Sequence, residues 1–183
     1  MARAETGARH LIDAHYESLY RYAYRLTGTV ADAEDLTQEA FAKAIARLSQ
    51  LRDRDRAKGW LFQILRNVYL HRVRDQRRHR FVSLDAIGDV PEDSSAPAES
   101  EVDPAKLQEA LNDLDESFRT PLILFYFEDF SYRDIADQMD LPIGTVMSRL
   151  ARAKAFLRTR LAPRPDPTTN SPDDAPRRAT HEL

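Results

Sequence analysis

One segment limits what this chain can fold into more than any other: residues 82–104, VSLDAIGDVPEDSSAPAESEVDP. It holds seven acidic residues, three prolines and no basic residue. Such a segment cannot bury enough apolar surface to offset the entropy lost on ordering, so we expect a flexible acidic linker. The chain then divides into a first unit over 1–81 and a second over 105–161. The remaining residues, 162–183, hold five prolines and no periodic apolar pattern, which predicts a disordered tail.

Apolar residues recur at helical spacing in both units, and we find no convincing strand pattern. In the first unit the pattern covers about 9–26, 33–48 and 58–78. Leu36 falls on the apolar face of the second of these helices, and Asp32 is its candidate N-cap. The predicted fold class is all-α, with two small helical domains.

The second unit predicts a helix-turn-helix. Ser131 and Asp134 have the spacing of a capping box at the start of a short helix, a tight connection follows at 140–142, and a longer helix covers 144–161. In this layout the second helix enters the major groove of DNA. An earlier helix of this unit is indicated by four apolar residues at spacings of three and four: Leu107, Leu111, Leu114 and Phe118.

The helix over 144–161 is basic within an acidic protein. It carries five positive side chains and no negative one between Arg149 and Arg160, whereas the whole chain has a net charge of −3. Thr145, Ser148 and Arg152 share a face with Arg149, opposite the apolar residues. Arginine can bond guanine through two N–H groups, and hydroxyls can reach base edges or phosphate. The alternative is an ordinary solvated basic face, but the preceding cap and turn favour DNA binding.

Acidic and basic residues of the first unit are concentrated in different segments of the sequence. From Gly28 to Phe41 there are four acidic residues and no base, whereas residues 52–80 hold ten Lys or Arg against three Asp. A basic stripe suits a phosphate backbone, and an acidic helix face suits a basic partner protein. Asn67 lies off the apolar face and could contact an exposed base. Trp60 lies on the apolar face, where a core role is the simpler interpretation.

Several classes of function are disfavoured. The chain has no cysteine, so disulfides, thiolate metal sites and a thiol nucleophile are excluded. Its five histidines form no group with carboxylates that would indicate a metal site, and no catalytic constellation is evident. We therefore expect no enzyme activity, cofactor or metal. The N-terminal segment lacks the apolar core of a signal peptide and no apolar run approaches membrane-spanning length, so we expect a cytoplasmic protein without membrane insertion.

Three segments, in order, carry a family resemblance: DAEDLTQEAFAKA, GWLFQILRNVYLHRVR and LPIGTVMSRLARAK. They resemble the extracytoplasmic-function (ECF) sigma factors of bacteria, and the similarity extends over about 9–161. It implies a protein that binds core RNA polymerase and directs it to promoters. The first unit would read and melt the −10 element, the second would read the −35 element, and the polymerase would supply the chemistry. An anti-sigma factor is the regulatory partner that the resemblance implies.

The resemblance also implies site residues. Docking on the clamp coiled coil of the polymerase would use Asp32, Asp35, Leu36, Gln38 and Glu39. Contacts with the −10 region would come from Leu51, Arg52, Arg54, Gln63, Asn67, Arg74, Arg77 and Arg78. The −35 groove would be met by Thr145, Met147, Ser148, Arg149, Ala151 and Arg152, and the second unit would also contact the polymerase flap.

The chain departs from the family pattern at three of these positions. Met147 stands where a basic residue is common, Ala151 where a larger or polar one is, and Leu51 where an aromatic one is. The first two departures would change the preferred −35 sequence, and the third would change one wall of the pocket for a −10 base. Two other functions remain open: a regulator that binds duplex DNA without polymerase, and an interaction protein that docks on polymerase without reading DNA.

Overall fold

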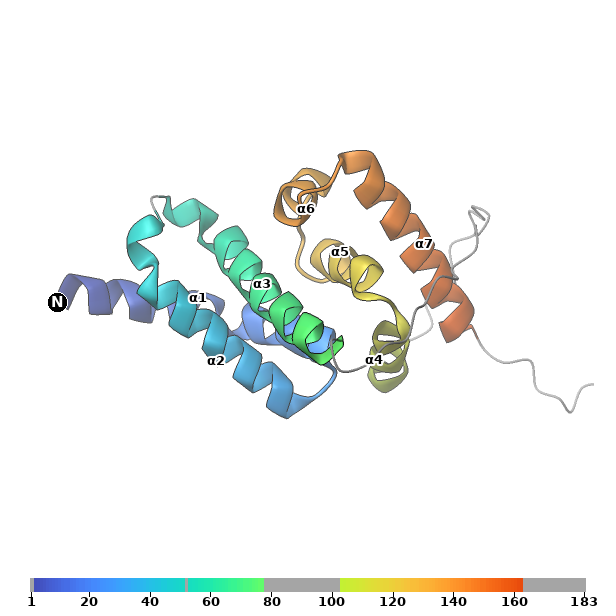
Figure 1. Ribbon diagram of the computed structural model, residues 1–183, viewed down its shortest axis with the longest axis horizontal. Helices are drawn as coiled ribbons and strands as arrows, with labels where there is room; N and C mark the ends of the chain where they lie inside the picture. Colours follow the sequence, from blue (N-terminus) through green and yellow to red (C-terminus); the bar gives the residue numbers. More distant parts are fainter. Residues whose placement is uncertain (1, 52, 78–102, 163–183) are drawn as a thin grey trace, which may run out of the picture.

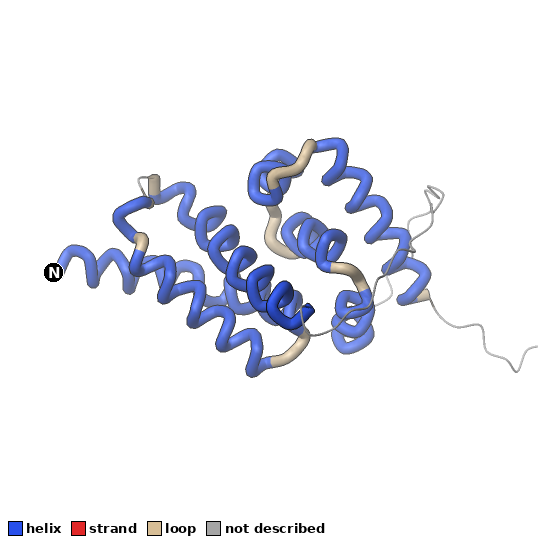
Figure 2. Tube along the Cα trace, in the orientation of Figure 1, coloured by secondary structure: helices blue, strands red, loops and turns tan. Residues whose placement is uncertain are grey.

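The computed structural model describes residues 2–51, 53–77 and 103–162. In these ranges the chain forms helices, turns and loops and no strand, which confirms the all-α prediction (Figure 2). The predicted linker falls almost wholly, and the predicted tail apart from Ala162, outside the described residues. No helix in the described ranges is both long enough and apolar enough to cross a membrane.

The N-terminal lobe is a bundle of three long helices (Figure 1). They are α1 (Ala2–Thr27), α2 (Val30–Ala46) and α3 (Ala57–Arg77), with the short 3-10 helices η1 (Leu48–Gln50) and η2 (Arg54–Arg56) between α2 and α3. Leu19 and Leu26 of α1, Leu36 and Ala40 of α2 and Leu65 of α3 are fully or almost fully buried. The apolar stripes read from the sequence therefore meet in one core.

The C-terminal lobe holds three short helices, α4 (Pro104–Asp113), α5 (Glu116–Tyr126) and α6 (Tyr132–Met139), and a longer one, α7 (Ile143–Leu161). Ile123 and Ile135 are fully buried, as is Val146 of α7, while Leu150 is almost so. Figure 1 shows α4, α5 and α6 beside α1 and α3, so the two lobes pack against each other, an arrangement that the sequence did not predict.

Three helix boundaries differ from the sequence prediction, and the first is the start of α1, which lies at Ala2 rather than near residue 9. Asp32 is not the N-cap of α2: Thr29 is, because its hydroxyl accepts the Asp32 backbone N–H at 3.2 Å while donating to the Asp32 carboxylate at 2.6 Å. The helix expected through Leu114 and Phe118 is broken between them. Asp115 accepts a hydrogen bond from the Ser117 backbone N–H and so starts a new helix, although both apolar side chains still pack in or against the core.

The helix caps and the tight turn between α6 and α7 confirm the predicted helix-turn-helix. The Ser131 hydroxyl accepts the Asp134 N–H, and the Asp134 carboxylate accepts the Ser131 N–H at 3.1 Å, which forms the predicted capping box of α6. Asp140 ends α6 in the left-handed conformation with φ of 53°. Pro142 then precedes α7 as its N-cap residue, so only a tight turn separates α6 from α7.

We expect Ser131→Ala to lower the free energy of unfolding by about 1 kcal/mol, the usual value of a lost N-cap. Chemical denaturation followed by circular dichroism would measure it, with Ser49→Ala as the control because Ser49 is exposed and caps no helix in the described structure. Equal stability of the two variants would contradict a role for the capping box.

Candidate nucleic-acid interface

The first turns of α7 present an open polar face. Met147 is 51 % exposed, and Ser148, Ala151 and Arg152 are exposed beside it, whereas Thr145 is half-buried. The opposite side of α7 packs into the lobe. All six residues expected to meet a DNA groove are therefore at least partly accessible, on the second helix of a helix-turn-helix.

Arg149 differs from its neighbours. It is half-buried, and its Nη1 donates to the Ser117 carbonyl at 3.3 Å, which ties α7 to the start of α5. This arginine therefore holds α7 in place.

A second accessible face lies on α3. Gln63, Asn67 and Arg74 are exposed and follow one another at spacings of four and seven, which aligns them along the helix. Arg77 belongs to the last turn of α3. The α3 face thus combines amide and guanidinium groups, as expected for contact with DNA bases and phosphates.

Three more residues predicted to contact the −10 region, Leu51, Arg52 and Arg54, belong to the connection between α2 and α3. Leu51 and Gln63 line one open cavity of about 820 Å³, together with half-buried Trp60. Arg54 lines a different, smaller cavity near the start of α1. Arg52 and Arg78 lie outside the described residues. Leu51 lines both cavities, so the structure brings it together with Gln63 in one and with Arg54 in the other.

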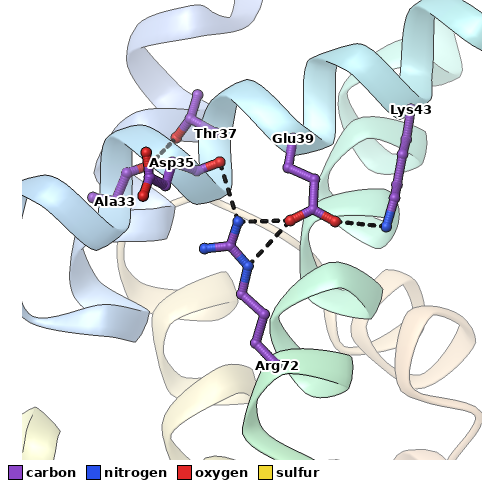
Figure 3. A network of polar contacts seen from close by, with 6 residues as sticks. All are labelled: Ala33, Asp35, Thr37, Glu39, Lys43 and Arg72. Atoms are coloured by element: carbon purple, nitrogen blue, oxygen red, sulfur yellow. Dashed lines mark hydrogen bonds and ion pairs between the residues drawn. The ribbon is translucent and has the colours of Figure 1, made fainter. Parts of the chain in front are cut away.

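The expected polymerase-docking face of α2 carries an internal ion-pair network (Figure 3). Glu39 pairs with Lys43 at 2.7 Å on its own helix and accepts two hydrogen bonds from Arg72 of α3, at 2.6 and 3.1 Å. Arg72 also donates to the Asp35 carbonyl at 3.3 Å. The Lys43 ammonium and then the Arg72 guanidinium hold the pKa of the Glu39 carboxyl below its usual range. Glu39 therefore fastens α3 to α2, and its charge is largely balanced within the lobe.

One residue predicted to dock on the polymerase lies in the core rather than on the surface. Leu36 is fully buried in the core and cannot offer its side chain to a partner. Asp32, Asp35 and Gln38 are exposed, and with Glu39 they form the surface called here the acidic ridge. Leu36 supports this ridge from below, as its place on the apolar face of α2 already indicated.

The sequence prediction missed Arg72. It is 33 residues from Glu39 in the chain, so no helical spacing links the two. Only the packing of α3 on α2 brings them together. Within the described ranges, no group of three or more histidine, aspartate or glutamate residues is arranged to hold a metal ion.

Both lobes match models of known protein families. The family model for sigma-70 region 2 matches residues 11–79, and that for sigma-70 region 4 matches 105–157. The chain is 34 % identical over 155 residues to the ECF RNA polymerase sigma factor SigL of Mycobacterium tuberculosis, covering 84 % of this chain and 88 % of SigL. This chain belongs to the ECF sigma factors.

Other members of the family agree in sequence and in fold. The ECF RNA polymerase sigma factor SigE of Mycolicibacterium smegmatis is 37 % identical over 165 residues, which cover 88 % of this chain but 64 % of SigE. The sigma factor RpoE of Bartonella quintana, crystallised with the anti-sigma factor NepR, matches with a TM-score of 0.68 and 29 % identity. That match covers 84 % of this ECF sigma factor and 95 % of the matched chain.

The Glu39 network predicts a specific pH dependence of stability. Because the pKa of folded Glu39 is lowered, its contribution is complete above the pKa of an unfolded Glu, about 4.3, and is lost as the pH falls through the folded value. We therefore expect Glu39→Gln to destabilise the protein at neutral pH and to match the wild type in strong acid. Urea denaturation at both pH values would measure the difference. Glu34→Gln, at an exposed position on the same helix, is the control, and a Glu39→Gln effect that did not change with pH would contradict the network.

Proposed function

We propose that this ECF sigma factor binds bacterial core RNA polymerase and directs it to promoters through −10 and −35 recognition. The observation that carries the proposal is the pairing of the accessible α3 face in a sigma region 2 match with the accessible α7 face in a sigma region 4 match. A regulator that reads duplex DNA alone needs only the second face.

The functional division follows the two matched regions. Residues 1–81 would bind the polymerase clamp coiled coil and the −10 strand, and residues 105–161 would bind the −35 duplex and the polymerase flap, joined by the acidic segment 82–104. The tail, 162–183, has no assigned part. Such a protein positions DNA and holds it open, and it performs no catalysis of its own. It would act in the cytoplasm, where polymerase and promoter meet.

The acidic ridge supports the polymerase contact. An exposed acidic helix face repels DNA and attracts a basic partner helix. Since Glu39 is already paired with Lys43 and Arg72, the unbalanced charge of the ridge lies at Asp32 and Asp35. We propose these two, with Gln38, as the residues that meet the clamp. An anti-sigma factor, as found with the B. quintana RpoE, would regulate this protein.

The direct test is transcription from a pool of randomised promoters by purified bacterial core polymerase, with and without this protein. We expect transcripts only when the protein is present, with enriched −10 and −35 sequences upstream of their starts. No transcripts from any matched core enzyme, combined with tight binding of the protein alone to duplex DNA, would establish the plain regulator instead.

Arg152 provides a sharper prediction within that function. It is exposed on the groove-facing side of α7. If it reads a base, Arg152→Ala loses about 1–3 kcal/mol of discrimination between the preferred promoter and one changed at a single −35 position. Lys154→Ala, an exposed residue two positions later, is the charge-matched control. An equal loss on both promoters would assign Arg152 to the phosphate backbone.

A further inference from the structure

Three exposed apolar residues follow one another along α7: Ile143, Met147 and Ala151, here called the exposed apolar row. They are spaced by four residues, so they adjoin on the helix surface. Met147 is 51 % exposed and Ile143 is 46 % exposed. Single exposed apolar residues are common on protein surfaces, but a row of them on one helix face indicates a surface that another molecule covers.

Small residues surround Met147 on this face. Gly144 precedes it by three positions and Ala151 follows it by four, so both adjoin it on the helix. A Cβ atom at Gly144 would meet no atom within 4 Å, so the surface there is open. Because neither neighbour carries a long side chain, a partner can approach the helix closely and contact the Met147 side chain.

Two polar side chains of the proposed −35 face already donate hydrogen bonds within the lobe. The Ser148 hydroxyl donates to the Thr145 carbonyl at 3.0 Å, and Arg149 Nη1 donates to the Ser117 carbonyl at 3.3 Å. Their capacity to donate to a base edge is therefore reduced. A larger share of the sequence reading then falls on the apolar side chains of the row.

The charges around the row favour DNA as the molecule that covers it. The helix α7 holds five basic residues and no acidic one. Ser148 and Arg152 each directly follow a member of the row, and both are exposed. Basic side chains attract phosphates, and the second helix of a helix-turn-helix turns its N-terminal residues toward base edges. The row begins at the first residue of that helix.

The major groove presents one apolar group of its own, the C5-methyl of thymine, beside hydrogen-bond donors and acceptors. An apolar side chain can therefore distinguish thymine by covering that methyl group. From Ile143 to Ala151 the helix rises about 12 Å at roughly 1.5 Å per residue, which is comparable to about three to four base pairs of duplex at roughly 3.4 Å each. The row is long enough to contact methyl groups on neighbouring base pairs.

We propose that the exposed apolar row reads thymine methyl groups in the −35 element, with Met147 as the main contact. This inference rests on the proposed function for the identity of the DNA element. A basic residue, common in the family at this position, bonds phosphate or guanine, whereas a thioether side chain carries no N–H donor. This protein therefore selects A·T pairs where Met147 faces the groove.

The test removes the methyl group from the DNA and the long side chain from the protein. In a promoter selected from the randomised pool, the −35 thymines of both strands are replaced one at a time by deoxyuridine, which lacks the C5-methyl and keeps the same hydrogen-bonding groups. Binding of each promoter by core polymerase carrying the wild-type or the Met147→Ala protein is measured by competition. Ile45→Ala, at an exposed apolar position on α2, is the control.

We expect at least one thymine whose replacement weakens binding by about fourfold with the wild type and with the control, the value for one buried methyl-sized group. Met147→Ala should weaken binding to the thymine promoter by a similar or larger factor. Replacing that thymine should then have little further effect, because both changes remove the same contact.

Two results would overturn the thymine-reading row. One is a selected −35 element without thymine on either strand. The other is a deoxyuridine effect of equal size with the wild-type and the Met147→Ala protein. A loss on Met147→Ala that is the same for every promoter would assign this side chain to a protein partner instead.

Duplexes selected by the protein alone separate this failure from failure of the proposed function. Promoter-specific transcripts with a deoxyuridine effect that does not depend on Met147 would reject the row and keep the sigma function. No transcripts, together with a Met147-dependent deoxyuridine effect on those duplexes, would reject the sigma function and keep the row as a reader of thymine. Absence of both transcripts and duplex binding would reject both.

Discussion

Packing of the two lobes against each other is the constraint on which the rest of this structure depends. Phe62 of α3 packs on Phe130 of the loop before α6, and Lys58 and Arg119 donate hydrogen bonds to backbone carbonyls of the opposite lobe. These contacts determine which faces remain accessible. The side of α7 proposed to bind DNA stays exposed, whereas Leu51 and Gln63 line a cavity together with acidic residues of the C-terminal lobe such as Asp134. The contact between the lobes therefore borders one of the two proposed DNA surfaces and leaves the other exposed.

Different polar contacts hold the helices of each lobe together. In the N-terminal lobe, Arg72 joins α3 to α2 through Glu39, so the orientation of the proposed −10 face depends on an ion pair with a residue of the acidic ridge. In the C-terminal lobe, the Ser131–Asp134 capping box and the Arg149–Ser117 hydrogen bond hold α6 and α7. Residues of the proposed binding faces thus also hold the scaffold together, and their substitution affects both roles.

Local signals in the sequence predicted most of the fold. Periodic apolar residues located the helices, and the Ser131–Asp134 spacing located the start of α6, because both depend on neighbours within a few residues. The break at Asp115 was missed because the apolar spacing continues through it into the next helix. The Arg72–Glu39 and Arg25–Glu128 pairs were missed because their members are distant in the chain and only tertiary packing joins them. Leu36 was assigned to a binding set although its own apolar pattern placed it in the core.

The measurement that tests the closed arrangement most directly is paramagnetic broadening in the free protein. A nitroxide attached through Glu109→Cys, exposed on α4 beside Gln108, whose side chain donates to the Arg25 carbonyl of α1, would be the single label in a chain without native cysteine. The account predicts strong broadening of the amide signals at the end of α1 and the following turn, residues 24–30, in addition to those near the label. Broadening confined to the C-terminal lobe would contradict it, because the lobes would then not be packed together in solution.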